Sequence, residues 1–209
     1  MKKLIIIVIF IVTVMFFEYD AYSQPQCPNG FSQSFVTLTV NGCDYTVEIC
    51  YICYMNRPSE VHVFGFSKID PNCPQTWNIN QVLAYIYSQV FTPLFLNNLC
   101  GLPGPCESGN ELWYSLFYEI CWEKIWSGGR VWYLPCNFQN CYCWELWKIC
   151  WDPALGQFVN IFVQGPGVSC PGYDPAINKC PNPESSVQDP TPYDPGPTNC
   201  FYISSPCYP

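Results

Sequence analysis

Cys143-Trp-Glu-Leu-Trp-Lys-Ile-Cys150 is the segment from which we predict the fold, because Cys43-Asp-Tyr-Thr-Val-Glu-Ile-Cys50 has the same spacing and stands 100 residues earlier. Each segment follows a strand-like run. Each is followed by a turn, an apolar run and a Cys-Pro pair, which is Cys73-Pro74 or Cys170-Pro171. This order predicts a β-meander that occurs twice and is held by disulfides. The alternative is two similar hairpins in one disulfide-rich sheet, which leaves the fold class unchanged.

The first meander has the plainest strand pattern. Residues 34–40 are rich in β-branched types and partly alternate polar with apolar residues. Asn41-Gly42 follows, which is the strongest two-residue hairpin signal. We expect a return strand over residues 43–54, and then a turn and a third strand over 61–66.

The spacing within each cysteine pair decides which bonds can form. Cys43 and Cys50 are seven residues apart, as are Cys143 and Cys150. Successive strand residues point to opposite faces, so an odd separation places the two sulfurs on opposite sides. We therefore expect each pair to bond to two different neighbours rather than internally.

A helix is predicted between the meanders. Apolar residues recur at helical spacing over residues 79–91, with Asn78 as N-cap and Gln81 three residues later. Pro93 stands just past the expected end. Residues 97–107 are expected to form a loop pinned by disulfides.

The second meander is expected to be rich in tryptophan. Residues 111–126 suit a strand better than a helix, and Ser127-Gly128-Gly129 predicts a hairpin with residues 130–134. The second copy would then take its three strands from residues 131–134, 143–151 and 158–163. The predicted organisation is a signal peptide (1–23), a first meander (24–75), a helix with a disulfide-pinned linker (76–108), a second meander (109–171) and a Pro-rich, cysteine-bearing tail (172–209).

The first residues have the form of a secretory signal. Lys2 and Lys3 precede an apolar run that is too short to span a bilayer, and Ala21-Tyr22-Ser23 provides small residues for cleavage. We therefore expect a secreted or extracellular chain with no membrane span after cleavage. The chain has no Asn-x-Ser/Thr sequence, which favours a bacterial source.

The chain has 16 cysteines, and an even number in an exported protein predicts a disulfide framework. His62 is the single histidine, so no zinc site is expected. The cysteines expected to form disulfides are Cys27, Cys43, Cys50, Cys53, Cys73, Cys100, Cys106, Cys121, Cys136, Cys141, Cys143, Cys150, Cys170, Cys180, Cys200 and Cys207.

The charge composition restricts the partners. The formal net charge is −8 and only 11% of residues are charged. With no basic patch, nucleic acid and anionic membrane surfaces are unfavourable partners. A surface with so little charge favours self-association, contact with other surface proteins or contact with glycans.

Seven of the eight tryptophans lie between residues 113 and 151. We expect Trp147 and Trp151 to face the core and Trp144 to face outward. The candidate contact surface is Trp122, Trp126 and Trp144.

No catalytic motif is evident. Glu119, Glu123 and Glu145 lie in the aromatic region, but a glycosidase needs two carboxylates held across a cleft, and spacing alone does not show one. His62 alternates with Val61 and Val63, so we expect it to face solvent in a structural role.

The sequence thus predicts a mainly β, disulfide-rich protein with antiparallel sheets and one inserted helix. We expect a structural or adhesive protein of the cell surface, matrix or an extracellular filament, with no enzymatic activity, metal or cofactor. The alternatives are a carbohydrate-binding module that uses exposed aromatic residues and a small secreted hydrolase.

Overall fold

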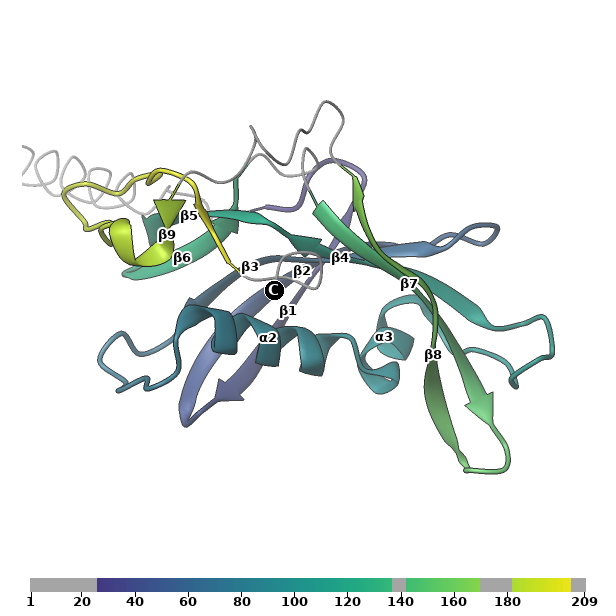
Figure 1. The fold of residues 1–209 in the computed structure, drawn as a ribbon. Helices are drawn as coiled ribbons and strands as arrows, with labels where there is room; N and C mark the ends of the chain where they lie inside the picture. Colours follow the sequence, from purple (N-terminus) through teal and green to yellow (C-terminus); the bar gives the residue numbers. More distant parts are fainter. Residues whose placement is uncertain (1–25, 137–141, 170–181, 204–209) are drawn as a thin grey trace, which may run out of the picture.

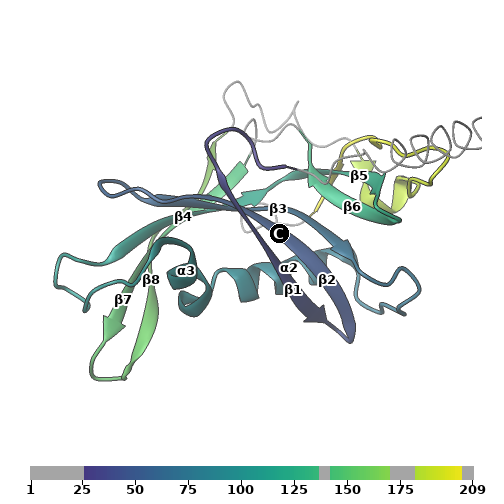
Figure 2. The same cartoon turned by 180° about the vertical axis from the view of Figure 1, so that it is seen from behind.

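The computed structural model describes residues 26–136, 142–169 and 182–203, so the predicted signal peptide lies outside the described residues. The described chain is mainly β, as predicted. It forms a twisted sheet, and two helices lie against the same side of it (Figures 1 and 2).

The bounds of the elements are as follows. The strands are β1 (Ser32–Val40), β2 (Cys43–Ile52), β3 (Ser59–Lys68), β4 (Leu112–Glu119), β5 (Cys121–Ser127), β6 (Arg130–Pro135), β7 (Tyr142–Asp152), β8 (Gln157–Ser169), β9 (Asn182–Pro183) and β10 (Phe201–Tyr202). The helices are α2 (Ile79–Val90), α3 (Pro93–Cys100) and the short 3₁₀ helix η1 (Glu184–Ser186).

The first meander is confirmed. β1, β2 and β3 pair antiparallel in sequence order. Asn41 and Gly42 form the β1–β2 turn with φ angles of 49° and 83°. Both angles are positive, which is the backbone geometry that matches a two-residue turn to the twist of its strands.

The predicted helix is also confirmed. Asn78 and Gln81 form a reciprocal capping box at the start of α2. The prediction of a single helix was wrong, because Pro93 does not close the helical region but begins α3. Thr92 caps α3 by accepting from the Phe95 N–H, and proline is well tolerated in a first helical turn, where its missing N–H has no partner to lose.

The sheet divides at β3. One edge of β3 pairs with β2, whereas its other edge pairs in parallel with β4 over residues 59–62 and antiparallel with β6 at Phe66. The β2–β3 register shifts between Glu48 and Ile49. At Gly65 an added Cβ would lie 2.8 Å from Leu134 Cδ2, so the absent side chain lets β6 approach. The parallel β3–β4 pair needs a long crossover, and α2 and α3 lie within it.

The second meander is not confirmed. β6 pairs with β5 across the predicted Ser127–Arg130 hairpin, but it does not pair with β7. β7 lies between β4 and β8 instead. Residues 111–126 also form two strands rather than one, with a break at Ile120. Residues 116–120 are all buried up to this break, so hydrophobic pattern alone could not reveal it.

The main core lies between the sheet and the two helices. Strand residues such as Val47, Ile49 and Leu116 pack in one cluster with Leu83 and Ile86 of α2. Trp147 packs against the same cluster, on the face that was expected for it.

The described disulfides follow the predicted parity. Cys43 bonds to Cys73 and Cys50 bonds to Cys27, on opposite faces of β2. Cys150 bonds to Cys106 rather than to Cys143, which is itself disulfide-bonded. The other two described bonds join Cys53 with Cys100 and Cys136 with Cys200.

These five described disulfides are typical of an extracellular or secreted protein, because such bonds persist in oxidising compartments. The structure offers no support for the expected bacterial source. Among the described residues, no helix has the length and apolar character needed to cross a membrane.

The prediction that His62 faces solvent was wrong. Its ring stacks on Phe117 with 4.2 Å between centroids, and its Nδ1 lies 3.2 Å from Glu119 Oε1. Phe31 and Tyr142 make edge contacts with the same imidazole ring. This second aromatic layer lies on the face of the sheet opposite the helices. The alternation of residues on β3 shows which face His62 occupies, but not that the face is covered.

Glu48 is a buried carboxyl group beside the Cys27–Cys50 disulfide. Its Oε1 accepts a hydrogen bond from Gln33, and its Oε2 is buried without a hydrogen-bond partner among the described residues. Burial raises the pKa of Glu48 to about 7, against an opposing effect of the Gln33 hydrogen bond. The folded state therefore favours the protonated acid.

This shift predicts that stability falls as pH rises. Below the ordinary pKa of 4.5 both states bind the proton, whereas between 4.5 and about 7 only the folded state does. We expect the free energy of unfolding of Glu48→Gln to equal that of the unchanged protein near pH 4. At pH 8 it should be higher by up to about 3 kcal/mol. Urea denaturation with the disulfides intact measures this. A difference that is constant across pH would contradict the assignment.

Candidate functional site

The three tryptophans of the predicted contact surface occupy three different environments. Trp122 is 0% exposed and makes an edge contact with Phe66, so its assignment to a surface was wrong. β10 pairs with β5 at this position, with Phe201 opposite Trp122. The docking of a segment from the far end of the chain buries Trp122, and local sequence does not report it.

Trp144 lies half-buried on the face of β7 opposite the helices. A Cβ added at Gly167 of β8 would lie 2.6 Å from the Trp144 ring, so the indole lies directly across that glycine. The ring therefore packs within the β7–β8 hairpin and presents only part of its surface to solvent.

Trp126 lines a cavity of about 570 Å³. The walls come from the start of α2, the ends of β2 and β3, the β5–β6 hairpin and the C-terminal segment 185–202. Five aromatic side chains contribute to them: Tyr45, Trp77, Trp126, Tyr133 and Tyr202.

Two cationic side chains also line this cavity. Lys68 donates from Nζ to the Cys73 carbonyl at 2.8 Å, and Arg130 donates to Thr46 Oγ1 at 3.1 Å. The Arg130 guanidinium also lies 4.8 Å from the ring centroid of Trp132. Burial lowers the pKa of Arg130, and the group still carries its charge at neutral pH.

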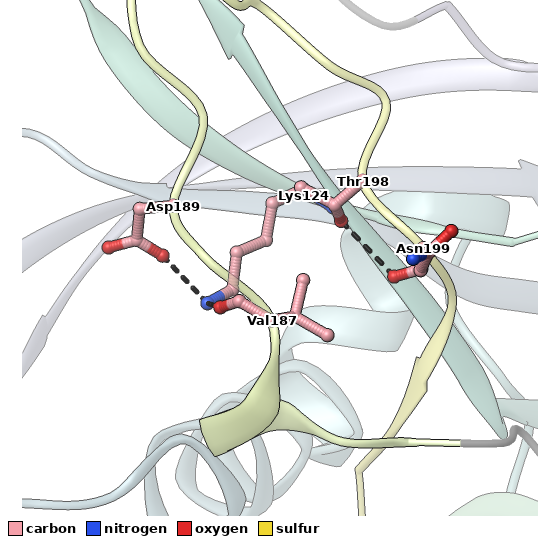
Figure 3. A network of polar contacts seen from close by, with 5 residues as sticks. All are labelled: Lys124, Val187, Asp189, Thr198 and Asn199. Atoms are coloured by element: carbon pink, nitrogen blue, oxygen red, sulfur yellow. Dashed lines mark hydrogen bonds and ion pairs between the residues drawn. The ribbon is translucent and has the colours of Figure 1, made fainter.

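A third cation, Lys124, lies behind the cavity and holds the C-terminal segment (Figure 3). Its side chain is 2% exposed, and Nζ lies 2.7 Å from Asp189 Oδ1 and 3.5 Å from the Val187 carbonyl. The backbone of Lys124 also bonds Thr198, whose N–H donates to the Lys124 carbonyl at 3.0 Å. With the Cys136–Cys200 disulfide, these bonds fasten the segment that closes one side of the cavity.

Two of the three acids considered for a hydrolase, Glu119 and Glu145, point to opposite faces of the sheet. Glu145 pairs in register with Leu116 on β4, three residues from Glu119, so the carboxyl groups of Glu119 and Glu145 lie on opposite faces of the sheet. Glu145 accepts from the Tyr118 hydroxyl at 2.7 Å and from Trp147 Nε1 at 3.0 Å. Burial raises the pKa of Glu123, which lies beside Cys136.

Two groups of potential metal ligands occur among the described residues. One is Cys27, Glu48 and Cys50, and the other is Glu123, Cys136 and Cys200. In both groups the two sulfurs are joined in a disulfide, so neither offers the thiolate that binds a metal.

The two outermost strands of the main sheet both lack charged residues. β1 and β8 lie at opposite ends of the strand path β1-β2-β3-β4-β7-β8, and no described strand pairs with the outer edge of either. β1 and β8 contain no charged residue, whereas every strand from β2 to β7 contains at least one.

The sequence pointed to Trp126 but not to the cations around it. Lys68 and Arg130 are far apart in the chain, and the register of β3 with β6 brings them together. The signal available in the sequence was the small number of bases. The described residues include only five, which are Arg57, Lys68, Lys124, Arg130 and Lys148.

The Lys124–Asp189 pair gives a testable prediction. We expect Asp189→Asn to loosen the C-terminal segment, because a charge that is buried at Lys124 loses its counter-ion. Limited proteolysis, mapped by mass spectrometry after reduction, should show faster cleavage within residues 184–199. Asp194→Asn is the matched control, because Asp194 bonds Thr191 through its backbone N–H. Equal cleavage of the two variants would contradict the role of the pair.

Comparison of this chain with protein-family models, with curated proteins and with solved structures gives no match. Its function is therefore argued from its own geometry.

Proposed function

We propose that this chain is a structural or adhesive protein of the cell surface, matrix or an extracellular filament, and that it self-associates through the edge strands β1 and β8. The observation that carries the proposal is the absence of charge from both edges of the main sheet.

Edge strands are normally protected. Their unpaired N–H and C=O groups can pair with another chain, and natural proteins block this with charged residues, proline, bulges or covering segments. In this sheet the edge strands β1 and β8 have no charged residue, and the charged strand residues lie on β2 to β7. Two identical chains therefore meet no like-charge repulsion along these edges.

β8 also exposes apolar side chains. Ile161, Phe162 and Val163 are 40%, 48% and 41% exposed. The first half of β8, over residues 157–164, contains no charge, proline or glycine, and Pro166 interrupts only the second half. A strand of this composition favours pairing with a second strand over exposure to water.

The arrangement of the edges supports assembly that propagates. β1 and β8 lie at opposite ends of the strand path, and in Figures 1 and 2 β1 runs across α2 whereas β8 lies beyond α3. If β8 of one copy pairs with β1 of the next, each copy retains one unused edge, and the contact repeats as a filament. Disulfides on both sides of the sheet preserve the fold of each subunit in this setting.

The proposal predicts that one charge on either edge blocks growth. We expect Thr37→Lys on β1 and Val163→Lys on β8 each to abolish large assemblies, because pairing would bury an uncompensated ammonium group. Sedimentation velocity and negative-stain microscopy of oxidised protein measure this. A mixture of the two variants should form 1:1 pairs, since each retains one intact edge.

Leu155→Lys is the matched control, because Leu155 is exposed in the turn of the β7–β8 hairpin and lies outside both edges. It should assemble like the unchanged protein. A monomer at high concentration in the unchanged protein would overturn the proposal, as would normal assembly of both edge variants.

A further inference from the structure

We infer that the cavity beside Trp126 binds an acidic saccharide, that is, a short chain of pyranose rings that carry carboxylate groups. This binding site is separate from the sheet edges and would give the protein a ligand in addition to its own copies.

The size and rigidity of the cavity suit a small ligand. Its volume of about 570 Å³ lies within the range of about 300–1,000 Å³ that is usual for ligand sites. The Cys43–Cys73 disulfide fastens the loop that precedes α2, and Cys136–Cys200 fastens the C-terminal segment. A preformed site loses little conformational entropy when it binds.

Two tryptophans from different parts of the chain line the cavity. Trp77 comes from the loop before α2 and Trp126 from the β5–β6 hairpin. Gln75 positions Trp77, because its Oε1 accepts from the Trp77 backbone N–H at 2.9 Å while its Nε2 donates to the Val40 carbonyl at 3.0 Å. Indole faces suit the C–H faces of pyranose rings, and their N–H groups can bond hydroxyls.

The charge of the cavity specifies an anion. Lys68 and Arg130 are lining residues in a protein whose formal net charge is −8. Asp189 is the acidic residue that lines the cavity, and Lys124 already neutralises it at 2.7 Å. Lys68 donates from Nζ to the Cys73 carbonyl and keeps further N–H donors for a carboxylate, whereas the Arg130 guanidinium is held at Thr46 and Trp132, on the opposite face of the sheet from Tyr45 and Tyr133.

Other ligand classes fit less well. An apolar ligand would desolvate the Lys68 ammonium group without compensation. Inorganic phosphate would leave both tryptophan faces unused. A nucleotide would offer its phosphate to Lys68 and its base to one tryptophan face, but it would leave the second tryptophan face unused. An acidic saccharide uses the aromatic faces, the cations and the polar side chains together.

The test is isothermal titration calorimetry of the full mature chain with its disulfides intact. The probes are α-1,4-linked trigalacturonate, its methyl ester, which has the same rings without charge, and adenosine monophosphate. We expect trigalacturonate to bind, with affinity that falls as salt is added. The methyl ester should bind at least about tenfold more weakly, since a charged hydrogen bond contributes about 1.5–3 kcal/mol and 1.4 kcal/mol is tenfold in affinity.

Variants then locate the site. Trp126→Ala and Lys68→Gln should each weaken trigalacturonate binding by about tenfold or more. Lys148→Gln is the matched control, because it removes the same charge from β7, where Lys148 lies 3.8 Å from Glu111. It should bind normally.

Three results would overturn the inference, and each can be obtained with the unchanged protein. The first is equal binding of trigalacturonate and its methyl ester. The second is binding of adenosine monophosphate without trigalacturonate. The third is no binding of any probe. Normal binding by both cavity variants would also overturn it.

Discussion

Two strands, β4 and β6, pair with different parts of the same edge of β3, and the rest of the structure depends on this arrangement. β4 pairs with residues 59–62, and β6 approaches at Phe66, next to the glycine that leaves room for Leu134. A strand edge offers a limited number of backbone groups, so the two neighbours must diverge. The sheet therefore opens into one wing that ends at β8 and another that ends at β5 and the C-terminal segment (Figure 1).

The first wing determines how copies of the chain can meet. The path from β1 through β3 to β8 places its charged residues on inner strands and leaves uncharged strands at both ends. The inner strands are held to the body from both sides, by Cys43–Cys73 and Cys27–Cys50 on β2 and by Cys106–Cys150 on β7. A rigid sheet with exposed and uncharged edges suits a subunit that joins its neighbours by backbone pairing.

The second wing creates the cavity. The β5–β6 hairpin bends away from β4 and faces the start of α2, and the C-terminal segment closes the remaining side. Three of the five bases among the described residues gather there: two line the cavity, and the third is buried in a pair with Asp189. In a protein of net negative charge this is a local cluster of positive charge, and it lies beside the five aromatic residues that line the cavity.

The sequence by itself determined the mainly β class, the first meander, the start of α2 and the rule that Cys43 and Cys50 bond to different partners. Each of these depends on residues close in the chain, through turn chemistry, capping and side-chain parity. Only the tertiary structure decided that β6 pairs with β3, that His62 and Trp122 are buried, and that Lys68 and Arg130 line one cavity. Those outcomes depend on which distant segments cover a given face. The stretch from Cys143 to Cys150 shows both effects, since its parity and its pairing with β8 were predicted correctly and its pairing with β4 was not.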